Sequence, residues 1–132
     1  MKVKVCIQKR GDPKTNVFLT LDAMISKDEY KIFNPAMQGV QNQDEPLTPK
    51  VPTLTFNAVE AAFKSGVFFA KHRVKAKAFH VKLLSFSMEG NVQDPIPFAV
   101  ATTVAIYEAT AGIRDYTEKE LSGWEVVSVE RQ

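Results

Sequence analysis

The residues best suited to acid–base chemistry are the two histidines, His72 and His80. An imidazole acts as a general base when a nucleophile lies within hydrogen-bonding reach. Ser85 and Ser87 follow His80 closely, but neither histidine lies in a recognisable catalytic motif, and no GxSxG sequence occurs. We assign no catalytic residue. An enzyme with an unrecognised His-dependent site is kept as an alternative, and the sequence favours a protein without catalytic function.

Metal and cofactor chemistry has little support in the residue spacing. Cys6 is the single cysteine, and the two histidines are too far from it in sequence to form a known zinc motif. The acidic pair Asp44 and Glu45 lacks the regularly spaced oxygen ligands of a calcium loop. The six glycines are scattered and form no phosphate-binding loop. We therefore expect neither a metal nor a cofactor.

Cationic side chains are unusually dense in residues 71–82. The segment contains Lys71, His72, Arg73, Lys75, Lys77, His80 and Lys82. Lys2 and Lys4 add two cations in the first predicted strand. If these strands are neighbours, one strand face is basic and suits the phosphates of a nucleic acid.

The alternative is a solvated charged surface whose lysines protect a sheet edge from aggregation. The net charge of +2 does not require a polyanionic partner. No aromatic stacking motif of the RRM type is evident in the sequence. The candidate nucleic-acid contacts are Lys2, Lys4, Lys75, Lys77 and Lys82.

The hydrophobic pattern indicates the elements that hold these side chains. Alternation over residues 3–7 and 17–21, with turn residues 10–13 between them, predicts a β-hairpin. Residues 26–33 fit either a helical turn capped by Ser26 or a short strand at 30–33. Four of the seven prolines lie in residues 34–52, which predicts a long loop.

The second half of the chain alternates helices and strands. Asn57 and Glu60 predict a helix N-terminus, and a helix follows to about residue 73. Residues 77–88 predict a strand that is central and covered on both faces or that contains a bulge, because its apolar residues change phase. Asp94-Pro95 predicts the N-cap and first position of a second helix, whose regular part follows Pro97 and ends at Gly112. A final strand follows from Trp124.

These elements predict one α+β domain over residues 1–132. The order is β-β-(β)-α-β-α-β, with a single mixed sheet of four to five strands and two main helices on one face. A chain of 132 residues with 45% hydrophobic residues can bury its own core. No signal peptide or membrane-spanning run occurs, so we expect a soluble cytoplasmic protein without membrane contact.

One stretch resembles a known family. The order Glu89-Gly90, Asp94-Pro95, a helix of small residues and ATAG at residues 109–112 resembles the proteolytic domain of ATP-dependent Lon proteases. That domain belongs to the ribosomal protein S5 domain 2-like fold, which domain IV of elongation factor G also resembles. The alignment puts Pro97 at the position of the nucleophilic serine, and no segment matches the catalytic lysine. The resemblance therefore implies the fold without the peptidase activity.

The sequence leaves three functions open. The leading expectation is a non-enzymatic interaction module with a protein partner and the 34–52 loop as its contact surface. The first alternative is nucleic-acid or ribosome association through the basic strand face. The second is the His-dependent enzyme.

Overall fold

The chain folds as one five-stranded mixed sheet with helices on one face. The computed structural model describes all residues, 1–132. The strand order is β3-β4-β2-β1-β5, in which β3 and β4 are parallel and the other neighbours are antiparallel. The predicted α+β class is confirmed. The elements are β1 Lys2–Lys9, β2 Asp12–Ser26, β3 Lys31–Phe33, a 3-10 turn Pro35–Met37, α1 Phe56–Ala70, β4 Ala78–Glu89, α2 Ile96–Thr110, α3 Glu118–Leu121 and β5 Trp124–Arg131.

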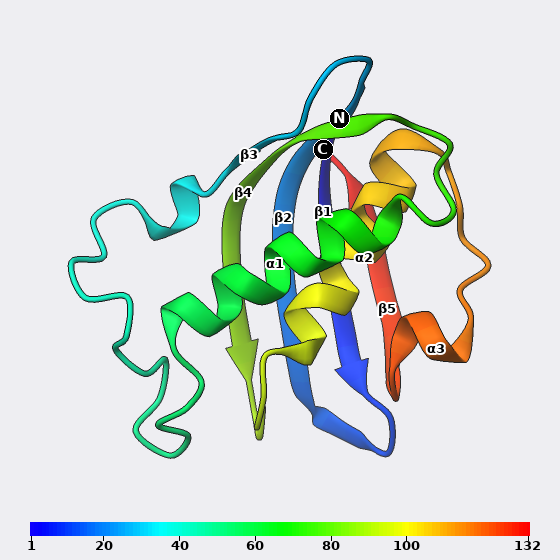
Figure 1. Ribbon diagram of the computed structural model, residues 1–132. Coiled ribbons are helices and arrows are strands. Elements are labelled where there is room, and N and C mark those ends of the chain that lie inside the picture. Colours follow the sequence, from blue (N-terminus) through cyan, green and yellow to red (C-terminus); the bar gives the residue numbers. More distant parts are fainter.

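Both main helices cover the same face of the sheet (Figure 1). α2 is almost entirely buried because it packs between α1 and the strands β1 and β2. The two helices approach closely at Gly66, where a Cβ atom would lie 2.6 Å from the carbonyl oxygen of Ala99. One continuous core results, and it includes Phe63 of α1, Phe98 of α2 and Leu21 of β2.

Of the two alternatives for residues 77–88, the bulge is present and the strand covered on both faces is wrong, because helices cover only one face of β4 (Figure 1). Thr20 of β2 pairs with Ser85, and the next residue, Leu21, pairs with Leu83. Leu84 is therefore the extra residue, and its insertion changes which side of β4 is apolar. The strand alternative for residues 26–33 is also correct, since β3 forms at Lys31–Phe33.

Two predicted helix starts are wrong by one or two residues. Thr55 caps α1 and accepts a hydrogen bond from the Ala58 amide, whereas Asn57 is already inside the helix. α2 begins at Ile96, one residue after the predicted first position and two residues before the predicted regular part at Phe98. At α1, Thr55 satisfies a free amide in place of Asn57, whereas at α2 the predicted cap, Asp94, accepts a hydrogen bond from the Ile96 amide.

Residues 34–52 form the predicted long loop beside β4, apart from the short 3-10 turn (Figure 1). The loop is anchored to the body of the protein. Met37, Val51 and Leu54 are buried in the core, and Pro46 and Thr55 form an isolated β-bridge. This segment is therefore part of the folded structure and lies along the part of β4 that β3 leaves unpaired.

Candidate functional site

The face of the sheet opposite the helices is uncovered and carries lysines at one end. Val3 and Val5 are fully buried toward the helices, so Lys2 and Lys4 point to the open face. The same alternation in β4 places Lys82 on the open face, next to the buried Val81. Three of the five predicted contact lysines therefore share one surface.

Strand register arranges these side chains in rows. One row crosses four strands and contains Phe33, Lys82, Asp22 and Lys2 as successive neighbours. A second row places His80 between Lys31 and Met24. We call this surface the sheet platform, and it comprises Lys2, Lys4, Asp22, Met24, Lys31, Phe33, His80 and Lys82.

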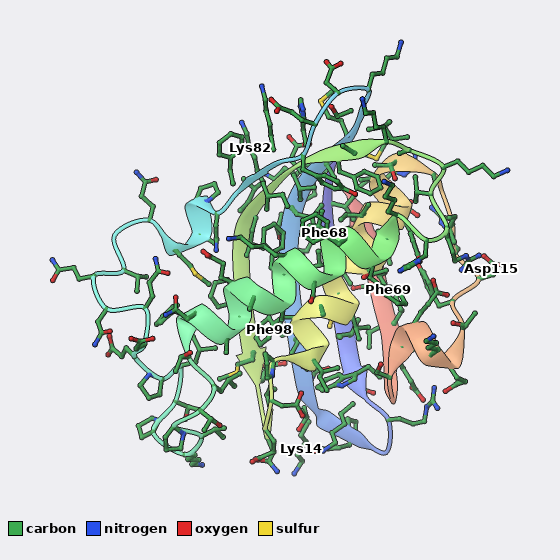
Figure 2. All side chains as sticks on the ribbon, viewed as in Figure 1. Lys14, Phe68, Phe69, Lys82, Phe98 and Asp115 are labelled. Carbon is green, nitrogen blue, oxygen red and sulfur yellow. The ribbon has the colours of Figure 1, made fainter.

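The other two predicted lysines lie beside the platform and not on it. Lys75 and Lys77 are in the segment that joins α1 to β4, at the end of the sheet where β4 begins. Lys27 and Lys71 are exposed near the same end. We call these four the rim lysines. In Figure 2, Lys82 and Lys14 mark opposite ends of the sheet, so the platform belongs to one end of the molecule.

The lysines of this end have no ion-pair partners. All four arginines form ion pairs, but Lys64 is the only lysine that does so, with Glu60 at 3.3 Å. The nearby carboxylates are Asp22, Asp28, Glu29, Glu130 and, in the groove beside Phe33, Glu60, against eight lysines on the platform and its rim. Asp22 pairs with the Met1 ammonium group at 3.0 Å. A local excess of positive charge remains at this end.

The arginines have a structural role on the helix side. Arg114 Nε lies 2.9 Å from Glu108 Oε2, and Arg131 Nε lies 2.8 Å from Glu108 Oε1. The Glu108 side chain is 0% exposed. The hydrogen bonds from Arg114 outweigh the effect of burial and lower the pKa of Glu108 from 4.5 to about 2. Glu108 is therefore a charged residue held in place by two cations.

A second network joins the end of α1 to α3. Arg73 donates to Glu120 at 2.9 Å and to Asp115 at 2.8 Å, and the Tyr107 hydroxyl also donates to Glu120. Burial opposes ionisation of Glu120, but hydrogen bonds from Tyr107 and Thr117 lower its pKa. Burial and the bond to Glu120 raise the pKa of Tyr107. No buried side-chain polar atom of this network lacks a hydrogen-bond partner, so the network stabilises the fold.

Neither histidine is part of a catalytic arrangement. The His72 ring packs edge-on against Phe69, with the centroids 5.3 Å apart. His80 lies on the platform, and its buried Nε2 has no hydrogen-bond partner. No hydrogen bond joins either histidine to Ser85, Ser87 or a carboxylate. No cluster of three metal-ligating side chains is present either.

A groove of about 440 Å³ begins at Phe33, at the outer end of the platform. Phe33 is 52% exposed and has no aromatic neighbour. Asn34 Nδ2 donates to Glu60 at 3.0 Å, while Asn34 Oδ1 is buried and accepts no hydrogen bond. The groove is lined by Phe33, Asn34, Pro35, Met37, Gln38, Gln43 and Glu60.

The position that aligns with the protease serine offers no reactive group. Pro97 is buried in the first turn of α2. Asp94 Oδ1 accepts a hydrogen bond from the Ile96 amide at 2.9 Å, so this aspartate is occupied as a helix cap. The resemblance to the S5 domain 2-like fold stays a prediction.

Comparison of the chain with protein-family models and with curated proteins finds no match in either set. The model contains no helix of the length and hydrophobicity that crossing a membrane requires. Functional inference therefore depends on the surfaces of this fold.

The sequence did not identify Phe33, Lys31 or the groove as parts of the candidate site. Residues 26–33 fitted two structures equally well, and only the strand alternative places Phe33 beside Lys82. The one signal for a strand here is the pattern of residues 31–33, a lysine followed by two apolar residues. In the structure it corresponds to an exposed lysine, a part-buried isoleucine and an exposed phenylalanine. Three residues are too few for such a pattern to identify a strand.

Proposed function

We propose that this protein is a non-enzymatic module that binds nucleic acid on the sheet platform. The observation that carries the proposal is the group of eight lysines without ion-pair partners at one end of the sheet. Nucleic-acid binding is favoured over the expected protein partner, because the strand register supports a basic surface formed by Lys2, Lys4 and Lys82.

Charge distribution explains how a chain with a net charge of +2 can attract a polyanion. The arginines are neutralised by carboxylates on the helix side, whereas the platform lysines are free to contact phosphate. Salt screens exposed charges over about 10 Å at 0.1 M, so a phosphate at the platform responds mainly to this local excess. Each phosphate contact releases counterions and makes the affinity depend on salt.

The test compares two triple variants with the same loss of charge. Lys2, Lys4 and Lys82 are replaced by Gln in one variant, and Lys9, Lys14 and Lys50 in the other. Binding of a labelled 12-nucleotide single strand is followed by fluorescence anisotropy between 50 and 200 mM NaCl. We expect the platform variant to reduce the slope of log K against log[salt] by about 2, since each lost contact contributes roughly 0.7 for single strands.

The second variant is the matched control, because its lysines lie at the other end of the sheet or in the loop beside it. It should keep the wild-type slope and most of the affinity. Equal losses in the two variants would show that only total charge matters and would contradict the platform as the site. Absence of binding to single-stranded or duplex nucleic acid at 50 mM NaCl would remove the proposal.

A further inference from the structure

The outer end of the platform combines an exposed aromatic ring, free lysines and a polar groove. Ile32 is partly buried against the core, so its neighbours Lys31 and Phe33 point to the open face. Phe33 is directly opposite Lys82 in the parallel register. An exposed ring between cations is the arrangement with which sheet surfaces stack unpaired bases.

From this arrangement we infer that the platform binds single-stranded nucleic acid, with one unpaired base stacked on Phe33 and its edge in the adjacent groove. The inference rests on the proposed function and names the form of nucleic acid. The backbone positions of Lys31 and Phe33 are about 6.6 Å apart along β3, and the backbone of Lys82 is about 4.8 Å from that of Phe33 across the sheet. The phosphates on either side of the stacked base can therefore contact these two lysines.

The groove supplies hydrogen-bonding groups for the base edge. Asn34 and Glu60 line it, and the part-exposed Glu60 carboxylate supplies oxygen acceptors, whereas Asn34 Oδ1 is buried beneath the surface. Gln38 and Gln43 add amides that both donate and accept. An exocyclic amino group of adenine or cytosine can donate to the Glu60, Gln38 and Gln43 side-chain oxygens, whereas thymine has no such group. We expect (dA)12 and (dC)12 to bind more tightly than (dT)12.

Duplex nucleic acid cannot bind in this way, because its bases are already stacked and paired. Phosphate contacts alone remain available to it on the platform. A single strand should therefore bind more tightly than a duplex of the same length, and the difference should depend on Phe33.

The experiment measures the binding of labelled (dA)12, (dC)12, (dT)12 and a 12-base-pair duplex to the full chain at 100 mM NaCl. We expect Phe33→Ala to weaken binding of (dA)12 by between about 5-fold and 100-fold, the range of base–aromatic stacking. Its salt slope should not change, because no cation is removed. Phe33→Leu retains the apolar volume without the aromatic face and should weaken binding similarly, while Phe33→Tyr should retain most of it.

Phe68 provides a matched control, since it is 50% exposed but lies on α1, on the helix side of the sheet (Figure 2). Phe68→Ala should bind (dA)12 like the wild type. Equal affinity for single strand and duplex, unchanged in Phe33→Ala, would overturn the stacked base and leave the proposed function intact. No binding to any of the four probes, with binding to phosphatidylserine vesicles instead, would overturn both.

Discussion

At the residue scale, this chain uses its two kinds of cation differently. The planar guanidinium groups of Arg114 and Arg131 meet the buried carboxylate of Glu108, where directed hydrogen bonds are effective. The platform lysines remain in solvent as mobile point charges. The arginines therefore stabilise the fold, and the lysines remain available for an external anion.

The Glu108 cluster predicts that acid lowers the stability contributed by Glu108 in the wild type and raises it in a variant without the two arginines. In the wild type its pKa falls from 4.5 to about 2 on folding, so its contribution to stability is present above pH 4.5 and is lost between pH 4.5 and 2. The double variant Arg114→Ala/Arg131→Ala leaves a buried carboxylate without a cation. Burial then raises the pKa of Glu108, and protonation favours the folded state as pH falls.

We expect the double variant to be less stable than the wild type by about 3–5 kcal/mol at pH 7. The difference should become smaller at pH 5 and smaller again at pH 3.5, as measured by urea unfolding. Arg10→Ala removes exposed pairs with Glu118 and Glu125 and should change the stability at pH 7 much less than the double variant does. A difference between double variant and wild type that stays constant with pH would contradict this account of Glu108.

At the element scale, the contact between α1 and α2 depends on one position without a side chain. The carbonyl oxygen of Gly66 accepts a hydrogen bond from Thr103 Oγ1 at 3.1 Å. A Cβ atom at this position would lie 2.8 Å from Thr102 Cβ as well as 2.6 Å from the Ala99 carbonyl. Since one of these atoms is backbone, the helices can relieve the clash only by moving apart.

Gly66→Ala should therefore reduce the free energy of unfolding by about 1–3 kcal/mol. This loss is expected although alanine has the higher helix propensity by about 1 kcal/mol. Ser65→Ala, at an exposed position one residue away, should leave stability unchanged or slightly higher. Guanidinium unfolding of both variants measures the two effects, and a Gly66→Ala variant as stable as Ser65→Ala would refute the close helix contact.

Element order was largely predictable, and the positions of the surface residues were not. The hydrophobic alternation predicts β1, and the glycine after α2 predicts where that helix ends. Both patterns can be recognised because they involve only residues close together in the sequence. The start of α1 at Phe56 was missed, since Glu60 bonds to Asn34 across the fold instead of completing a capping box. The row from Phe33 to Lys2 crosses four strands and depends on three strand registers, which a single sequence does not specify.

At the scale of the whole molecule, the lysines of one end are close enough to repel one another. This repulsion opposes folding and should be strongest at low salt, where the Debye length is about 30 Å at 0.01 M. Adding NaCl to 0.15 M shortens that length to about 8 Å and removes most of the repulsion. The eight unpaired lysines are thus a cost to stability that a bound polyanion would also remove.

Replacement of the rim residues Lys27, Lys75 and Lys77 by Gln should therefore reduce the response of stability to salt. Between 10 and 150 mM NaCl, we expect the variant to gain less free energy of unfolding than the wild type, by up to about 1 kcal/mol. Thermal and urea unfolding at the two salt concentrations measure this difference. The Lys9, Lys14 and Lys50 triple variant has the same net charge and should respond to salt like the wild type, because its lysines are not part of the platform or its rim. Equal salt responses in the two variants would mean that total charge, and not the group of lysines at one end, determines the electrostatic cost of folding.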